Sequence, residues 1–374
     1  MKILQVNKLY TPDIGGVETV CQQYSELYAK KHDVVVLCVH KKFKLLGDVS
    51  YINGVKVIRC SSLGMFFSMP VSLSFLYHFI IQFIKCDIAF IHLPFPLADV
   101  SWMFSSFVKR RVYLVWHSDI VKQGLFKKLL GPILRLSVRN ANKILVTSPL
   151  MLDFSDSLSS VRHKCSVIPL SVDSSKIKQQ ANFKTNIEEV EHLTEIDGLF
   201  FGRLCYYKGV NVLLDSLVNG SKNGFTPKVV IAGRGEYAEL ITKTIITYNL
   251  TNVIFINRFL SEEEKYNLIK MSKCFLFPSI EVSEAFGITQ LEAMCLGIPV
   301  INTDLASGVP WVSLHDETGL TVEPKNLVQF LDAFKLLLGN DILRKKFSES
   351  AIKRVATEFD DTIIIKKLNL LIEE

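Results

Sequence analysis

The chain has 374 residues, 49% of them hydrophobic and 21% charged, with 43 Lys and Arg against 37 Asp and Glu. This length allows two domains that each bury a core, and this composition excludes a disordered or fibrous protein. The formal net charge is only +6, and the cations do not interleave with aromatic residues in a known nucleic-acid-binding motif. We therefore expect no nucleic-acid partner.

Short apolar runs alternate with helical stretches through the first 150 residues. These runs lie at 2–7, 33–39, 55–59, 87–92, 111–116 and 143–147. Alternation of this kind predicts a parallel sheet with helices on both faces. The first run is soon followed by Pro12 and Asp13, which is unlike a secretory signal, so we expect a cytoplasmic protein.

Three residues in this half directly follow predicted strands. Gly15 and Gly16 come after the first run, and His117 ends the run at 111–116. A glycine pair lets backbone N–H groups approach an anion, although a tight turn is its common structural use. His117 would emerge at the carboxyl edge of the sheet, where open α/β sheets bind ligands, although a lone histidine at a strand end is usually structural.

Two segments of this half raise the question of membrane contact. Residues 63–85 are apolar but interrupted by Pro70, His78 and Gln82, which predicts a loop and a buried helix instead of a membrane span. Residues 124–143 combine leucines with five cations, which suits either an interfacial helix or an ordinary packed amphipathic helix.

Charge is unevenly distributed along the chain. Residues 1–150 contain 19 Lys or Arg and 8 Asp or Glu, a net of +11, whereas the remainder has 24 against 29, a net of −5. A basic first half predicts an anionic partner, and a membrane surface that carries a lipid diphosphate would qualify.

A second alternating series follows a polar stretch. Its apolar runs lie at 198–203, 228–233, 252–257, 274–279 and 299–303. We therefore assign 1–172 to an N-terminal domain, 173–195 to a linker and 196–355 to a C-terminal domain. Both domains are expected to be Rossmann-like, with parallel sheets.

Two cations lie between a predicted strand and a predicted helix in the second series. Arg203 and Lys208 belong to the sequence GRLCYYKG and would project from the carboxyl end of the strand. A planar guanidinium and a point charge together suit a diphosphate. Either cation alone would more often be an ordinary surface residue.

Two glutamates, Glu284 and Glu292, are separated by seven residues. The composition of 286–297 predicts a helix that Gly297 ends before Pro299. On a continuous helix, eight steps advance about 12 Å and turn about 80° beyond two full turns, so both acids can address one side. We place Glu292 on ribose hydroxyls and Glu284 on a sugar, with the helix N-terminus near a diphosphate. The alternative is a capping Glu284 and a solvated Glu292.

Metal and disulfide chemistry are not indicated. The sequence contains no D-x-D triplet and no His or Cys cluster with metal-ligand spacing, so we expect no metal and no other cofactor. The eight cysteines are scattered and form no C-x-x-C pair, which predicts buried thiols in a reducing compartment.

Nearly end to end, the sequence resembles the retaining glycosyltransferases of family 4, which have the GT-B architecture of two facing Rossmann-like domains. The resemblance rests on DIGGVE (Asp13 to Glu18), WHSD (Trp116 to Asp119), VIPLSVD (Val167 to Asp173), GRLCYYKG (Gly202 to Gly209), Phe277 to Ile301, and SGVPWVSLHDETGL (Ser307 to Leu320). The last of these resembles a bacterial subgroup that builds O-antigen or capsular polysaccharide.

The resemblance implies roles for individual residues. Arg203 and Lys208 would grip the donor diphosphate and Glu292 the ribose, while Glu284 and the backbone amides of Phe286 and Gly287 would hold the transferred sugar. Gly15 and Gly16 would approach donor phosphate or acceptor. His117 would contact the donor sugar near the reacting carbon, with Asp119 on the acceptor side. A C-terminal helix over 356–374 would pack back on the first domain.

The implied function is transfer of a hexose to a polyprenyl-diphosphate-linked glycan on the inner face of the cell membrane. The first candidate for this hexose is mannose from GDP-mannose. The implied enzyme is retaining, metal-independent and peripheral. Alternatives are a UDP-sugar-dependent transferase of the same fold, a non-catalytic nucleotide-sugar-binding protein derived from one, and an epimerase. A nicotinamide-dependent enzyme is disfavoured because no G-x-G-x-x-G follows the first strand.

Overall fold

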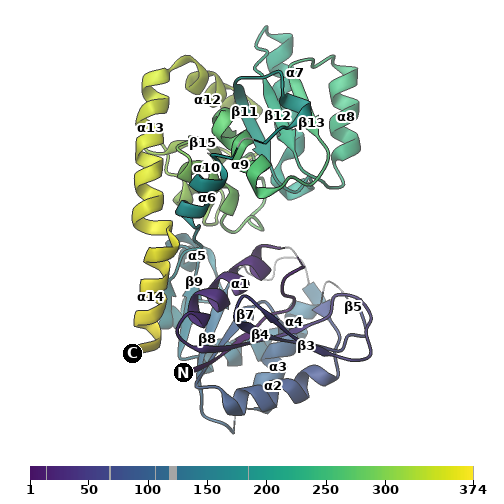
Figure 1. The fold of residues 1–374 in the computed structure, drawn as a ribbon, viewed down its shortest axis with the longest axis vertical. Coiled ribbons are helices and arrows are strands. Elements are labelled where there is room, and N and C mark those ends of the chain that lie inside the picture. Colours follow the sequence, from purple (N-terminus) through teal and green to yellow (C-terminus); the bar gives the residue numbers. More distant parts are fainter. Residues whose placement is uncertain (14, 67–68, 106, 118–123, 184, 374) are drawn as a thin grey trace. The chain divides into compact units, whose positions relative to one another are not determined.

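The chain forms two compact units in a computed structural model that describes residues 1–13, 15–66, 69–105, 107–117, 124–183 and 185–373. Unit 1 comprises residues 1–168 together with 365–374, and unit 2 comprises residues 169–364 (Figure 1). Each unit is built on its own parallel-dominated sheet, as the alternating apolar runs predict.

Unit 1 contains, within the described residues, an eight-stranded sheet in the order β10-β9-β8-β7-β1-β2-β4-β3. All neighbouring strands pair in parallel except β3 and β4. The strand order reverses between β1 and β7, which is the switch point where open sheets of this kind bind ligands. The strands are β1 (Lys2–Val6), β2 (Asp33–Val39), β3 (Asp48–Ile52), β4 (Val55–Cys60), β7 (Ile88–Leu93), β8 (Arg111–Trp116), β9 (Lys143–Val146) and β10 (Cys165–Val167).

Helices connect these strands, as right-handed crossovers require. They are α1 (Gly16–Ala29), α2 (Ser74–Lys85), α3 (Pro96–Phe104), α4 (Gly124–Asn140), α5 (Pro149–Phe154) and the short η1 (Ser159–Lys164), and β5 (Met65–Phe66) pairs antiparallel with β6 (Met69–Pro70). Helix α2 buries Phe75, Phe79 and Phe83 completely, so the predicted buried helix within residues 63–85 is confirmed over Ser74–Lys85. Among the described residues, no helix has the length and apolarity needed to cross a bilayer.

Unit 2 contains a six-stranded parallel sheet in the order β13-β12-β11-β14-β15-β16, counted over the described residues. Its switch point lies between β11 and β14. The strands are β11 (Ile196–Phe201), β12 (Val229–Ala232), β13 (Val253–Ile256), β14 (Ser272–Leu276), β15 (Val300–Thr303) and β16 (Gly319–Val322). The helices are α6 (Ser174–Gln180), η2 (Glu188–Val190), η3 (Tyr206–Lys208), α7 (Val210–Lys222), α8 (Ala238–Thr247), α9 (Glu262–Met271), α10 (Ile288–Cys295), α11 (Val309–Val312), α12 (Leu327–Gly339) and α13 (Asp341–Arg354).

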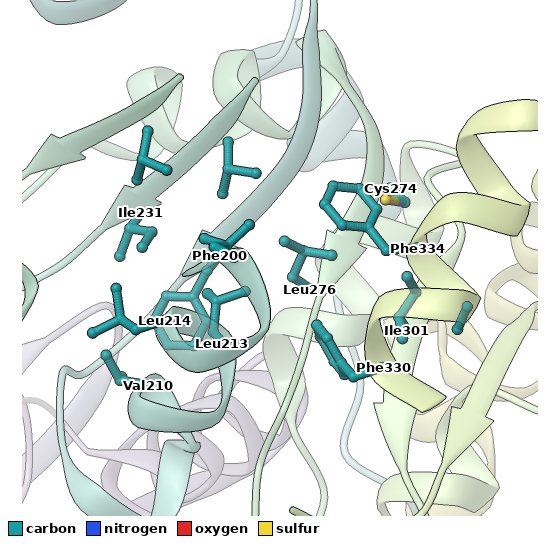
Figure 2. Packing of buried hydrophobic residues seen from close by; sticks show 14 of the residues in the cluster. Phe200, Val210, Leu213, Leu214, Ile231, Cys274, Leu276, Ile301, Phe330 and Phe334 are labelled. Carbon is teal, nitrogen blue, oxygen red and sulfur yellow. The ribbon is translucent and has the colours of Figure 1, made fainter. Parts of the chain in front are cut away.

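The core of unit 2 holds the two central strands against helices α7 and α12. Figure 2 shows Phe200 of β11 and Leu276 of β14 among buried side chains that include Leu213 and Phe334. Gly198 makes room for this packing, because a Cβ there would lie 2.7 Å from Phe334 Cζ. Each such buried side chain stabilises the fold by roughly 1.5–3 kcal/mol, so the strand ends that follow Phe201 and Leu276 are firmly positioned.

The stretch predicted as a linker is instead part of unit 2. Residues 174–180 form α6, and Lys176 Nζ lies 2.7 Å from Glu262 Oε2 on α9. Lys270 Nζ then donates a hydrogen bond to Asn182 Oδ1 at 2.9 Å. A polar composition suggested an extended linker, but these charged side chains are anchored to α9.

The C-terminal segment is divided between the units. A π-helical turn at Val355–Phe359 is followed by α14 (Asp361–Glu373), and unit 1 includes residues from Ile365 onward. Three donors of unit 1 bond backbone carbonyls of α14: Tyr28 Oη to Leu368 at 3.0 Å, Tyr113 Oη to Leu371 at 3.1 Å, and Arg111 Nη1 to Ile372 at 2.9 Å.

Candidate donor site at the switch point of unit 2

Two loops leave the switch point of unit 2 side by side. The loop after β11 runs through Arg203 to η3, and the loop after β14 runs from Phe277 to Glu284. Ile280 N donates to Tyr207 O at 2.9 Å, which ties the loops together. Gly209 ends η3 with φ +68°, and a Cβ there would lie 1.8 Å from Pro278 O. Only glycine fits this approach, which fixes Lys208 beside the β14 loop.

Lys208 and Glu284 form a close ion pair. Lys208 Nζ lies 2.5 Å from Glu284 Oε2, and the two side chains are only 13% and 10% exposed. The ammonium also lies 5.0 Å from the centroid of the Phe277 ring. An ammonium group has three donors, so Lys208 can hold Glu284 and still donate to an incoming anion. The structure therefore brings together two residues that the sequence placed 76 positions apart.

Arg203 lies on the same loop and is exposed. Its backbone is held by neighbours, because Cys205 N donates to Arg203 O at 3.1 Å and Leu204 N donates to Arg234 O at 2.9 Å. An exposed guanidinium at the carboxyl end of β11 is accessible to a phosphate group, and its five donors suit bidentate binding.

The helix that carries Glu292 begins later than predicted. Helix α10 starts at Ile288, and its N-cap Gly287 has φ +81° and ψ +68°. The expectation of a helix from Phe286 is therefore wrong, because the left-handed Gly287 interrupts it. A Cβ at Gly287 would lie 2.6 Å from Phe277 Cζ, so this turn requires glycine. Glu284 and Glu292 are thus placed by a tight turn and a helix, not by eight steps of one helix.

The segment before α10 is held in place by a buried aromatic ring and a backbone hydrogen bond. The Phe286 ring is 2% exposed and meets the rings of Trp311 and Phe359 edge-on at 6.2 and 6.0 Å between centroids. Gly308 N donates to Ala285 O at 2.8 Å. No side chain caps α10, so its first backbone N–H groups need partners from outside the helix, as at anion-binding helix termini.

Glu292 is held by two residues that the sequence analysis did not single out. Glu292 Oε1 lies 2.6 Å from Lys265 Nζ and accepts a hydrogen bond from Tyr266 Oη at 3.3 Å. Glu292 is 8% exposed, so the alternative of a solvated glutamate is wrong. Burial and the charge of Glu292 raise the pKa of Tyr266, so its hydroxyl remains protonated and donates. Nothing in the sequence of α9 distinguishes these two residues from an exposed helix.

The replacement Glu292→Gln is expected to weaken nucleotide binding by about 10- to 100-fold, because a charge-assisted hydrogen bond contributes about 1.5–3 kcal/mol. Calorimetric titration with the nucleoside diphosphate measures this loss. The matched control is Glu264→Gln, which changes a carboxylate on α9 that pairs with Arg258 at 2.8 Å. Unchanged affinity in Glu292→Gln would remove the ribose assignment.

The glycine pair of unit 1 begins helix α1. Gly15 is the N-cap and Gly16 the first helical residue. A Cβ at Gly15 would lie 2.1 Å from Glu18 Oε2, whereas a Cβ at Gly16 would meet nothing within 4 Å. The backbone at Gly16 is therefore open, which is the condition for close approach of a ligand.

His117 belongs to a buried chain of hydrogen bonds. Its Nε2 lies 2.9 Å from His92 Nδ1, and His92 Nε2 lies 2.9 Å from Gln5 Oε1. The imidazole rings stack at 5.2 Å between centroids and 13° between planes. His117 directly follows β8, and His92 and Gln5 are the last but one residues of β7 and β1; these three strands are neighbours at the switch point of unit 1. The sequence indicated His117 but not His92 or Gln5. Asp119 lies outside the described residues.

Burial lowers the pKa of His117 to about 3 and that of His92 well below its usual value. Both imidazoles are therefore neutral near pH 7, and each can donate from one ring nitrogen and accept at the other. Burial also raises the pKa of Asp99, at the start of α3, to about 7.

Acid is expected to destabilise unit 1 through His117. Between about pH 3 and the ordinary value of 6.5, the unfolded chain binds more protons at this residue, so the free energy of unfolding rises with pH and is lost on acidification. Urea titrations across this window measure the slope, which should become shallower in His117→Gln, where His92 still contributes with the same sign. His163→Gln, at an exposed histidine of the same unit, should keep it. The raised pKa of Asp99 changes the free energy of unfolding in the opposite direction. This effect is the same in the parent protein and in both variants, so it cancels when their slopes are compared.

Among the described residues, no group of three or more His, Cys, Asp or Glu is arranged to hold a metal ion. All eight cysteines are free, seven of them buried and Cys165 half-buried. The prediction of buried thiols is confirmed for these seven.

Two units with parallel-dominated sheets are typical of the GT-B fold of glycosyltransferases. The family models for glycosyl transferases group 1 and for glycosyltransferase family 4 match residues 182–354 and 14–176. The chain belongs to this family of glycosyltransferases, as the resemblance implied.

Relatives and solved structures agree with this assignment. The chain is 30% identical to O-antigen chain mannosyltransferase C of Escherichia coli, over 99% of this chain and 98% of that protein. It is 32% identical to D-rhamnosyltransferase WbpZ of Pseudomonas aeruginosa, over 68% of this chain and 64% of the relative. The fold matches HepE of Anabaena in complex with UDP, with a TM-score of 0.76, 17% identity and full coverage of both chains.

Proposed function

We propose that this protein is a retaining, metal-independent hexosyltransferase that moves mannose from GDP-mannose to a polyprenyl-diphosphate-linked glycan in surface polysaccharide synthesis. The observation behind this proposal is the ion pair of Lys208 and Glu284 beside an uncapped helix that carries the buried Glu292. The similarity to a relative named as a mannosyltransferase in E. coli supports the choice of mannose.

In the proposed reaction, Arg203 and Lys208 bind the donor diphosphate and stabilise the negative charge that develops on it as the glycosidic bond breaks. Glu284 and the amides of Phe286 and Gly287 orient the sugar, and Glu292 binds the ribose. The acceptor hydroxyl attacks the face that the leaving group vacates. A donor phosphate oxygen takes the hydroxyl proton, so bond formation, bond cleavage and proton transfer balance without a protein nucleophile.

On unit 1, we assign roles to His117 and to the open backbone at Gly16 as the family resemblance implies. Because His117 Nε2 donates to His92 Nδ1, the other ring nitrogen of a neutral His117 would accept from a hydroxyl of the donor sugar, and Asp119 would act on the acceptor side. We further propose a cytoplasmic enzyme bound peripherally to the inner face of the membrane, which suits the net charge of +11 in residues 1–150.

The test is a calorimetric screen of GDP, UDP, GDP-mannose and UDP-hexoses with EDTA present, followed by NMR of the product's anomeric centre. Binding of GDP and GDP-mannose and an unchanged anomeric configuration are the expected results. Selective binding of UDP-sugars would favour the second candidate, a UDP-hexose transferase, for which the UDP complex of HepE is the supporting comparison. Binding without transfer to any lipid-linked glycan would indicate a non-catalytic binding protein, and an inverted product would overturn retention.

A further inference from the structure

Exposed apolar side chains gather at one edge of unit 1. The segment before β3 forms an antiparallel bridge with the segment before β5, through Lys44 N to Ser62 O at 2.8 Å and Ser62 N to Lys44 O at 2.7 Å. Leu63 N donates to Val71 O at 2.8 Å, which joins the stretch before α2. We call the six side chains around this junction the apolar edge; they are Phe43 (64% exposed), Leu45 (71%), Leu46 (78%), Leu63 (52%), Val71 (42%) and Leu73 (81%).

Eleven of the thirty large apolar side chains exposed on the described residues lie between residues 43 and 77. Isolated exposed apolar residues are ordinary, whereas a contiguous group on one surface indicates an interaction site. In the sequence, the apolar edge flanks β3, the last strand of the sheet, and the antiparallel pair of β5 and β6. The side chains of α2 that follow are buried instead, at Phe75, Phe79 and Phe83. Helix α2 leaves only Tyr77 (64%) and Ile84 (44%) exposed among its large apolar side chains, so most of the apolar residues left outside the core here come from the connecting segments.

The excess of positive charge around the apolar edge favours an anionic bilayer as its partner. Residues 41–86 contain six Lys or Arg and a single acid, Asp48. Lys41 and Lys44 are 60% and 48% exposed, with carboxylates at 4.0 and 2.6 Å. Exposed pairs of this kind are weak, so both lysines can turn to other anions. A second copy of this surface would bring like charges together, whereas an anionic bilayer neutralises them and accepts the leucines.

We propose that the apolar edge inserts into an anionic lipid surface, with Lys41, Lys42 and Lys44 contacting the headgroups. The inference rests on the proposed function, which requires access to a lipid-linked acceptor. It places membrane contact on residues 41–46, 63 and 71–73, and it does not need the interfacial helix considered for residues 124–143.

The test is flotation of the full chain with vesicles of phosphatidylcholine that contain phosphatidylglycerol, compared with phosphatidylcholine alone. The double variant Leu46→Glu/Leu73→Glu should lower partitioning into the anionic vesicles by roughly tenfold or more. The matched control is Ile246→Glu/Ile342→Glu in unit 2, where the replaced side chains are 74% and 85% exposed. This control should float like the parent protein. Substituting Lys41 and Lys42 by Gln should weaken binding to anionic vesicles most strongly at low salt.

Equal partitioning of the Leu46→Glu/Leu73→Glu variant and its control would overturn the inference. So would a dimer by light scattering that this variant alone dissociates, because a second copy would then cover the apolar edge. Nucleotide binding is measured calorimetrically in the same samples. If the parent protein binds no nucleotide but needs the apolar edge for flotation, the proposed function fails and the inference stands. If the parent protein binds nucleotide and the variant floats as well as the parent, the proposed function stands and the inference fails.

Discussion

Replacing Lys208 with Ala is expected to lower kcat/KM for sugar transfer by about 10²- to 10³-fold, the usual effect of removing one group that stabilises charge in a transition state. Lys208 is the cation that the structure places at 2.5 Å from Glu284 and beside the uncapped α10. Steady-state kinetics with the lipid-linked acceptor measures the loss. Because the lysine acts on developing charge, kcat should fall more than donor affinity.

Loss of Lys208 also leaves Glu284 buried without its cation, which alone destabilises a protein by about 3 kcal/mol or more. The double variant Lys208→Met/Glu284→Gln removes both charges and should recover stability without recovering transfer. Lys273→Ala is the matched control, because Lys273 pairs with Glu195 and Asp197 at 2.9 Å in the same unit. If Lys208→Ala kept full turnover in its folded fraction, the diphosphate assignment would be wrong.

Replacing Gly209 with Ala is expected to destabilise unit 2 by about 2–5 kcal/mol, because left-handed strain and overpacking add together. The new Cβ would lie 1.8 Å from the backbone oxygen of Pro278. To relieve this clash, the loop of Gly209 and the loop of Pro278 must move apart, which would displace Lys208. Transfer should therefore fall with stability. Urea unfolding and activity assays on the same samples measure both effects.

Gly224 provides the control for this substitution. It has φ +77°, close to the +68° of Gly209, but a Cβ there would meet nothing within 4 Å. Gly224→Ala should cost only about 1–2 kcal/mol of left-handed strain and leave transfer intact. Equal losses at both positions would show that the contact with Pro278 contributes nothing.

The sequence predicts the sheets well because buried parallel strands are continuous apolar runs. Every apolar run singled out in both halves overlaps an observed strand. Strands β3, β5, β6, β10 and β16 escaped prediction, because an edge strand with half-exposed residues, or a run of two to four residues, has little periodicity. Helix α6 was taken for part of a linker for a related reason: its lysines appear solvated until Glu262 of α9 is placed beside Lys176.

The candidate-site residues that follow strands could be predicted from the sequence. The residues that take part only through partners distant in sequence could not. Lys208 and Glu284 follow β11 and β14, so topology alone brings them together. Gly287 was taken for a helical residue because nothing local reveals its positive φ. Lys265 and His92 act through side chains distant in sequence, and only the packing of α9 on α10 and of β7 on β8 shows their partners.

The hydrogen bonds from Tyr28, Tyr113 and Arg111 to the carbonyls of α14 have a consequence for biosynthesis. Unit 1 consists of residues 1–168 and 365–374, so the ribosome releases most of it first but supplies its last segment only after all of unit 2. Until then, the two buried tyrosines lack these acceptors. The unit whose synthesis begins first is therefore completed last, and its nascent form exposes the surface that α14 later covers.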